Sequence, residues 1–350
     1  MDTLRVLSKS NEIIIISKKD IKLKKYKNIK SVNLNISRKL FFFEDIFVLL
    51  QIFKLLILNK PNLILTITPK ISFIVSIILI FYPIKRIHFF TGQLWYNMKD
   101  FKKLIFKFID RFIFIKSHIC FADSKSQINY LIKEGFKKSK LKIINKGSMC
   151  GVDTNIFKKN EILKKSFREK YDIKKNDVIL MFLGRINRDK GYYDLIYLRD
   201  LLYKNNIKIS LVLIGHDEED LILNENKNTR QKFIYLGYKK NPQHYFPCAD
   251  IFVILSKREG FGLSVIQASS CQLPVIGYDV VGLKDSILNN KTGILINNLN
   301  NMKDIKKIFT IIKDKNLRYK LGKQGRKNVI NNFEKKDVIH FMSKQIEKYI

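Results

Sequence analysis

The chain has 350 residues, of which 46% are hydrophobic and 28% charged, and its 66 Lys and Arg against 31 Asp and Glu give a formal net charge of +35. This length and composition suffice for two folded domains and exclude a globally disordered chain. The basic excess reflects either a composition rich in Lys, Ile and Asn or attraction to an anionic partner, a membrane surface or nucleic acid. Nucleic acid is disfavoured, because the lysines are spread along the chain and no nucleic-acid-binding motif is recognisable.

Short apolar runs alternate with helical patterns in the first part of the chain, which predicts parallel strands covered by helices. The predicted strands are Ile13–Ile16, Leu63–Thr66, Arg86–Phe90, Ile119–Ala122 and Leu141–Ile144. The predicted helices are Asp45–Leu58, Ile71–Phe81, Lys102–Ile113 and Lys125–Glu134. The longest apolar run, Ile71–Ile84, is shorter than the ~20 residues of a membrane-spanning helix, so we interpret it as a buried helix.

A second series of strands and helices begins at Asp177, after a polar stretch, Lys158–Lys165, that we interpret as a hinge region. The predicted strands are Val178–Leu183, Ile207–Ile214, Lys232–Leu236, Ile251–Leu255 and Pro274–Ile276. The predicted helices are Tyr192–Tyr203 and Leu263–Gln272, and after Gly293 the chain is expected to become helical.

Cysteine and histidine residues are scattered. Cys120, Cys150, Cys248 and Cys271 have neither disulfide-like nor metal-ligand spacing, and the five histidines form no cluster. Charged residues interrupt the start of the chain, so we expect no signal peptide. These features predict a reduced cytoplasmic protein without a metal site.

The most informative segment lies between the predicted strand Ile251–Leu255 and the helix that follows it. The segment reads Ser256-Lys-Arg-Glu-Gly-Phe-Gly-Leu-Ser-Val-Ile-Gln267. A glycine-bearing turn that opens a helix offers backbone N–H groups to an anion, and the helix dipole favours the negative charge. Such a segment can hold a phosphate and nearby hydroxyls, and sugar nucleotides carry both.

This segment resembles the signature of GT-B retaining glycosyltransferases of family 4, in which two glutamates are separated by seven residues. The chain keeps the first as Glu259 and has Gln267 in place of the second. Three further stretches carry the resemblance: Phe182–Gly191, the pair Gly282–Ile287 and Asn290–Leu295, and His88–Trp95. The likeness runs from about Ile13 to the C-terminus.

The resemblance implies an α/β fold of GT-B type, with two Rossmann-like domains facing each other across a cleft. Residues 1–160 would form an acceptor-side domain, residues 161–334 the nucleotide-sugar domain, and a helix over about 335–350 would cross back. Met1–Ser10 resembles the end of the family's first helix, so the first domain lacks its N-terminal strand and glycine-rich loop. We expect either a start upstream of Met1, which we prefer, or a rebuilt first domain.

The resemblance also implies a donor site. Arg185 and Lys190, bracketed by Gly184 and Gly191, would stabilise the leaving diphosphate, and Glu259 would accept hydrogen bonds from the sugar hydroxyls. Close backbone contacts would come from Gly260, Phe261, Gly262 and Leu263, and Gln267 would meet the nucleotide ribose. Surface cations and a helix-surface glutamine without a ligand are the alternatives.

On the acceptor side, the resemblance places Thr91, Gly92 and Gln93 against the cleft. Many relatives carry a histidine where Thr91 stands, so a general base is not expected there. His88 is interpreted as a strand-end histidine whose hydrogen bonds are satisfied within the fold.

The implied activity is that of a retaining hexosyltransferase (EC 2.4 class) in the assembly of capsule, lipopolysaccharide or another polysaccharide. It would move a sugar from a UDP- or GDP-sugar to a lipid-linked or other glycan acceptor, without a cofactor and without a metal, since no Asp-x-Asp sequence is present. The enzyme would be cytoplasmic and peripheral to the inner face of the plasma membrane, held at its anionic surface. Two alternatives stay open: a non-catalytic glycan- or lipid-binding module, and a sugar-nucleotide epimerase of the same architecture.

Overall fold

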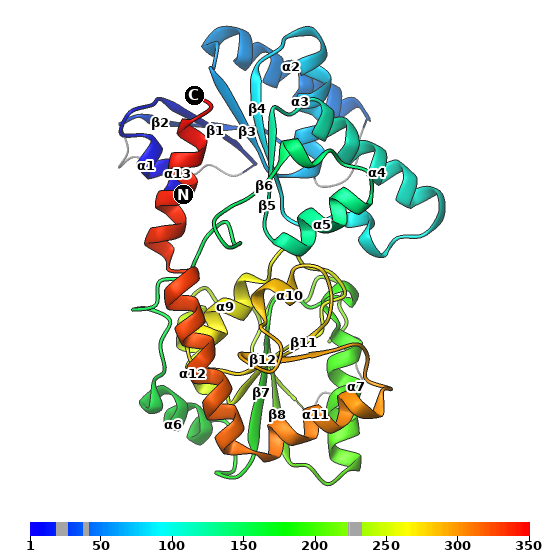
Figure 1. Cartoon of the computed structure of the whole chain (residues 1–350), viewed down its shortest axis with the longest axis vertical. Coiled ribbons are helices and arrows are strands. Elements are labelled where there is room, and N and C mark those ends of the chain that lie inside the picture. Colours follow the sequence, from blue (N-terminus) through cyan, green and yellow to red (C-terminus); the bar gives the residue numbers. More distant parts are fainter. Residues whose placement is uncertain (19–26, 38–41, 223, 225–232) are drawn as a thin grey trace. The chain divides into compact units, whose positions relative to one another are not determined.

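A computed structural model describes residues 1–18, 27–37, 42–222, 224 and 233–350, and the chain divides into two compact units (Figure 1). The first unit comprises Met1–Asp123, Ile128–Asn145 and Asp337–Ile350. The second comprises Ser124–Gln127 and Lys146–Lys336. The structural boundary after Asn145 therefore precedes the one that we drew after residue 160.

The second unit is built on a six-stranded sheet in the order β12-β11-β10-β7-β8-β9, in which every neighbouring pair is parallel. The strands are β7 (Val178–Leu183), β8 (Ile209–Ile214), β9 (Ile234–Tyr235), β10 (Ile251–Ile254), β11 (Val275–Tyr278) and β12 (Gly293–Ile296). Nearly continuous apolar runs form the central strands because both faces of a covered parallel sheet are buried. Along β7, Leu180 and Phe182 enter one core while Ile179 and Met181 enter the other.

Helices cover both faces of this sheet (Figure 1). One core receives side chains of α7 (Tyr192–Lys204) and α11 (Met302–Lys313), and the other receives side chains of α6 (Glu161–Lys170) and α9 (Leu263–Ser270). The remaining helical segments are α10 (Leu283–Ser286), α12 (Lys315–Asn332) and the short 3-10 turns η3 (Arg188–Lys190), η4 (Pro242–His244) and η5 (Phe246–Cys248). The result is a three-layer α/β unit, as the sequence predicts.

The first unit contains two parallel sheets. One pairs β1 (Ile13–Ser17) with β2 (Ile29–Asn33), and the other has the order β3-β4-β5-β6. The strands of the second sheet are β3 (Leu63–Thr66), β4 (Lys85–Phe90), β5 (Ile119–Ala122) and β6 (Leu141–Ile143). No described strand joins the two sheets.

Its helices are mostly longer than the sequence patterns predict by one to three residues at an end. They are α1 (Asp2–Leu7), α2 (Phe42–Asn59), α3 (Pro69–Phe81), α4 (Asp100–Ile115), α5 (Lys125–Lys133) and α13 (Lys335–Glu347), with 3-10 turns η1 (Leu94–Asn97) and η2 (Lys138–Lys140). None of the helices in the described ranges is both long and apolar enough to span a bilayer.

Three sequence-based interpretations differ from the structure. The chain does not become helical at once after Gly293, because Gly293–Ile296 pairs with β11 as the edge strand β12. Most of the stretch interpreted as a hinge lies in α6, whose first turn is capped where the Asn160 side chain accepts a hydrogen bond from the Leu163 amide. Strand β2 was not predicted, since its sequence, Ile-Lys-Ser-Val-Asn, has few apolar residues.

Candidate functional site

The order of strands in the second unit reverses at β7. The chain passes from β7 to β8 and β9 on one side, and then to β10, β11 and β12 on the other. In open α/β sheets ligands bind beyond the carboxyl ends of the strands at such a switch point. The turns that follow β7 and β10 are therefore the expected location of a ligand site.

The turn after β7 is held by a network of short contacts. Asn187 is buried, and its side chain accepts a hydrogen bond from the Lys190 amide at 2.9 Å and donates to Glu218 Oε2 at 3.0 Å. Gly191 has a φ of +80°, and a Cβ there would lie 2.1 Å from the carbonyl oxygen of Leu255. Only glycine fits this approach. The turn is thereby packed against the end of β10.

The two predicted diphosphate cations have different surroundings. Lys190 donates from Nζ to Glu259 Oε1 at 2.6 Å, and the two side chains are only 20% and 14% exposed. Arg185 is 54% exposed and lies 3.0 Å from Glu218 Oε2. The structure thus brings together Lys190 and Glu259, which are distant in sequence, while Arg185 projects from the same turn as Lys190 toward another carboxylate.

The turn after β10 supplies the other half of the candidate donor site. Gly260, Phe261 and Gly262 are buried and Leu263 is exposed. Gly262, with a φ of +93°, is the N-cap of α9. The loop after β11 packs directly on this turn, because a Cβ on Gly282 would lie 2.5 Å from the Glu259 carbonyl oxygen. Unbonded N–H groups in the first turn of a helix suit an anion.

Gln267 lies one turn further along α9 and is partly exposed. Its backbone carbonyl accepts from Cys271, and no hydrogen bond of its side-chain amide to another described residue is present. The amide is therefore available to a ligand, and its contact with a nucleotide ribose stays a prediction.

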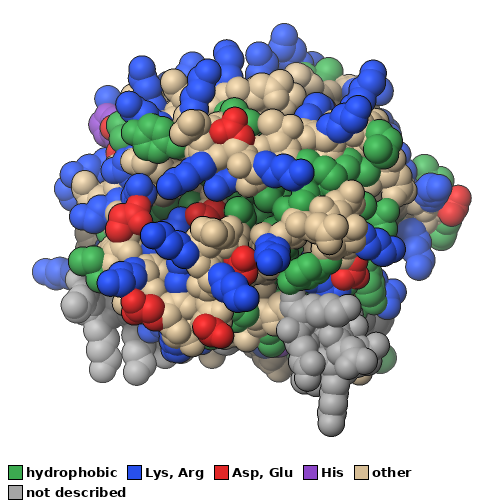
Figure 2. Space-filling model, turned by 90° about the horizontal axis from the view of Figure 1, so that it is seen from below, with side chains coloured by type: hydrophobic (Ala, Val, Ile, Leu, Met, Phe, Trp, Pro, Cys, Tyr) green, Lys and Arg blue, Asp and Glu red, His purple; other side chains and the backbone are tan. Residues whose placement is uncertain are grey.

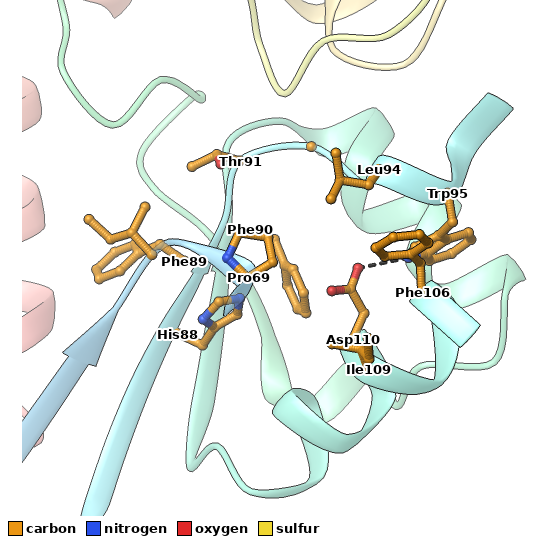
Figure 3. A pocket seen from close by; sticks show the side chains of 12 residues that line it. Pro69, His88, Phe89, Phe90, Thr91, Leu94, Trp95, Phe106, Ile109 and Asp110 are labelled. Atoms are coloured by element: carbon orange, nitrogen blue, oxygen red, sulfur yellow. Dashed lines mark hydrogen bonds between the residues drawn. The ribbon is translucent and has the colours of Figure 1, made fainter. Parts of the chain in front are cut away.

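The residues predicted for the acceptor side follow β4 in the first unit, next to a small hollow of about 20 Å³ (Figure 3). Thr91 and Gly92 line this hollow, whereas Gln93 is buried and is not one of its lining residues. The space holds about one water molecule.

His88 lies inside β4, not at its end as the sequence analysis expected, because β4 continues to Phe90. It is buried, with Nδ1 at 3.0 Å from Thr66 Oγ1 and 3.2 Å from Ser72 Oγ. Burial, and then the nearby charge of Arg86, hold the pKa of His88 well below its usual range. The two hydroxyl groups give Nδ1 of His88 partners within the fold, in keeping with a structural role for this histidine.

Asp110 of α4 was not identified from the sequence. The residue is 7% exposed and lines the same hollow, and its carboxylate accepts a hydrogen bond from Trp95 Nε1 at 2.7 Å (Figure 3). Burial raises the pKa of Asp110 to about 6, although the bond from Trp95 opposes this shift. The sequence feature that could have identified it is a single acidic residue within the mostly apolar stretch Phe106–Ile115.

Asn187 and Glu218 were also missed by the sequence analysis. Their roles depend on contacts between the turns after β7 and β8, which no local pattern encodes. Among the described residues, no group of three or more His, Cys, Asp or Glu side chains is placed to hold a metal ion.

Comparison with known proteins agrees with this geometry. Residues 164–328 match the model of the family described as glycosyl transferases group 1, a range that includes both turns of the candidate donor site. The chain is 28% identical over 337 residues to a capsular polysaccharide biosynthesis glycosyltransferase, CapM, of Staphylococcus aureus, covering 93% of this chain and 87% of that protein.

Two solved structures show the same fold over 99% of the chain. A sucrose-phosphate synthase from Thermosynechococcus elongatus has a TM-score of 0.83 at 18% identity, with 91% of its chain covered. HepE of Anabaena, crystallised with UDP, has a TM-score of 0.78 at 14% identity, with 94% of its chain covered. The chain is therefore a glycosyltransferase of GT-B fold, and its second unit belongs to the group 1 glycosyl transferases.

Proposed function

We propose that this enzyme transfers a sugar from a UDP- or GDP-sugar, with retention of anomeric configuration, to a surface-glycan precursor that is lipid-linked. The observation that carries the proposal is the meeting of Lys190 and Glu259 at the switch point of the second sheet, 2.6 Å apart. A cation for a diphosphate and a carboxylate for sugar hydroxyls are the two groups that a nucleotide sugar needs. The UDP bound to HepE and the polysaccharide named for CapM support the choice of donor and product class.

In the proposed reaction Lys190 and Arg185 face the diphosphate. The leaving nucleoside diphosphate gains negative charge as the glycosidic bond breaks, so a fixed cation stabilises the transition state more than the ground state. Arg185 offers a planar fork to phosphate oxygens, and Lys190 offers a point charge on a flexible chain. No metal or other cofactor has a part in this scheme.

Glu259 accepts hydrogen bonds from the donor sugar in this scheme. Without donor, the Glu259 carboxylate accepts a charge-assisted hydrogen bond from Lys190. When the donor binds, this bond is replaced by hydrogen bonds from Lys190 to phosphate oxygens and from the sugar hydroxyls to Glu259. Gly260, Phe261, Gly262 and Leu263 contribute backbone contacts, and the Gln267 amide meets the ribose. Retention follows from front-face attack, in which the departing phosphate oxygen takes the acceptor's proton and no side-chain nucleophile is required.

The acceptor side lies in the first unit, at the turn Thr91–Gln93. We place the enzyme in the cytoplasm, peripheral to the inner face of the plasma membrane, because a lipid-linked acceptor resides there and the net charge of +35 favours an anionic surface. The basic run Lys18–Lys27, expected from the sequence to contact this surface, lies for the most part outside the described residues.

The pure enzyme incubated with a panel of UDP- and GDP-sugars tests the proposal, with released nucleotide and the remaining sugar nucleotide measured with and without a lipid-linked acceptor. A glycosyltransferase releases nucleotide faster with acceptor, and the anomeric configuration of the product, read by NMR, reports retention or inversion. An epimerase converts the sugar nucleotide with no acceptor, and a binding module gives neither reaction.

A further inference from the structure

Helix α4 of the first unit is apolar on two opposite faces. One face packs into the core through Ile113 and Phe114 and carries Asp110 toward Trp95. The opposite face carries large apolar side chains that are exposed to solvent. These are Phe101 (73% exposed), Leu104 (64%), Ile105 (42%), Phe108 (66%) and Ile115 (65%), which we call the α4 stripe.

The spacing of the α4 stripe makes it continuous along the helix. At 100° per residue its members fall within an arc of about 100°, on the side away from the buried face. A helix on the surface of a globular protein normally presents polar residues there. A continuous apolar surface of this kind marks a site of interaction with a partner or a membrane.

The edges of the α4 stripe are basic. Lys102 and Arg111 are exposed and lie beside it, one on each side, and Lys99 is exposed just before the helix begins. Arg111 also donates one hydrogen bond to the Glu134 carbonyl at 3.0 Å. The acids of the helix are Asp100, at its first residue, and Asp110, buried on the opposite face. Apolar residues bordered by Lys and Arg are typical of helices that lie in the interface of an anionic bilayer.

The neighbouring helices also expose apolar side chains. Helix α3 packs against both α2 and α4 (Figure 1). Phe73 of α3 meets Phe112 of α4 in an edge-to-face contact. Phe81 at the end of α3 is 79% exposed, and α2 exposes Phe47 (61%) and Leu50 (56%).

We propose that the α4 stripe docks the enzyme on the surface of an anionic lipid bilayer, with Phe101, Leu104 and Phe108 inserted among the acyl chains and Lys102 and Arg111 against the headgroups. A second copy of this chain is a poor occupant, because two molecules of net charge +35 repel each other. Figure 2 shows one face of the molecule, on which Lys and Arg are spread over the surface instead of gathered in one patch. On that face the charge marks no docking patch, so we take the apolar stripe as the feature that selects the docking surface. This inference rests on the membrane-bound acceptor proposed above and names the surface that reaches it.

Co-sedimentation of the full chain with vesicles tests the proposal, with mixed phosphatidylglycerol–phosphatidylcholine vesicles compared with pure phosphatidylcholine. Leu104→Asp and Phe108→Asp are the test variants, and Ile162→Asp is the matched control, because Ile162 is 80% exposed on α6 of the second unit. We expect wild type and Ile162→Asp to bind the anionic vesicles equally. Each test variant should bind them about tenfold or more weakly, because full burial of one such side chain contributes at least that factor.

Three results of the vesicle assay would each overturn the proposal: no binding of wild type to anionic vesicles, equal binding to neutral ones, or test variants that bind like the control. A wild-type dimer that Leu104→Asp dissociates would also overturn it, by assigning the stripe to a protein interface. Calorimetric titration of each variant with UDP and GDP measures nucleotide binding independently of vesicle binding, so the docking proposal and the proposed activity are tested separately. A chain that docks through the stripe but uses no nucleotide sugar would leave the docking surface standing and refute the transferase proposal.

Discussion

Replacing Asp110 by Asn should change how the stability of the first unit depends on pH. The residue is 7% exposed, and burial raises the pKa of its carboxyl from the ordinary 3.8 to about 6. A carboxyl whose pKa is raised by folding stabilises the fold fully below its unfolded pKa, and this contribution is lost as pH rises through the folded pKa. Two pKa units at 1.36 kcal/mol each give ~3 kcal/mol lost between about pH 4 and pH 7. Asn keeps an acceptor oxygen for Trp95 and has no charge to bury.

The assay is urea unfolding of both proteins at several pH values, followed by fluorescence of Trp95. The chain has one tryptophan, and it is the partner of Asp110, so the signal reports on this unit alone. The free energy of unfolding of Asp110→Asn minus that of wild type should rise by ~3 kcal/mol from pH 4 to pH 7. A difference that stays constant over this range would refute the reasoning, because it would mean that Asp110 titrates as an ordinary exposed carboxyl.

Three further predictions concern the second unit. Gln267→Glu should lower the KM for the donor with kcat nearly constant, because a hydrogen bond to a charged acceptor contributes ~1.5–3 kcal/mol against ~0.5–1.5 for a neutral one. Calorimetric titration with the nucleoside diphosphate checks this. Unchanged affinity in both Gln267→Glu and Gln267→Ala would show that Gln267 is not part of the site. Transfer should be insensitive to EDTA, since Arg185 and Lys190 take the electrostatic role, and activity lost to EDTA and restored by Mg²⁺ or Mn²⁺ would contradict this. Gly191→Ala should destabilise the unit far more than Gly237→Ala in thermal unfolding. Both glycines have a positive φ, but of the two only Gly191 would bring a Cβ against backbone, at 2.1 Å from the Leu255 oxygen. Equal decreases in the Tm of the two variants would contradict this close approach.

The sequence predicts the central strands well for a clear physical reason. Val178–Leu183 and Ile251–Ile254 are apolar runs buried on both faces of a parallel sheet, and their predicted bounds agree with the structure to within one residue. Short edge strands carry less information, so β2 was missed and β12 was taken for the start of a helical region. Helix α6 was not predicted either, because its lysines and glutamates resemble a polar linker.

The candidate site is predictable only in part. The glycine turns around Gly184–Gly191 and Glu259–Leu263 are local patterns, but the contact of Lys190 with Glu259 depends on the reversal of strand order at β7. The bond from Trp95 to Asp110 likewise joins a 3-10 turn to a helix. The exposure of Phe101, Leu104 and Phe108 was not predicted, since an apolar helix is expected to be buried on every face that its neighbours can cover.

The turnover of Lys190→Ala compared with Lys164→Ala tests the central claim most directly. Both lysines belong to the second unit and have nearly equal exposure, 20% and 23%, and each forms one short ion pair, Lys190 with Glu259 at 2.6 Å and Lys164 with Asp250 at 2.5 Å. Loss of stability should therefore be similar, while only Lys190 faces the diphosphate in the proposed reaction. We expect Lys190→Ala to lower kcat by about 100- to 1,000-fold with a donor that wild type uses, and Lys164→Ala to leave kcat near that of wild type. Equal kcat values in the two variants would contradict the assignment of the site.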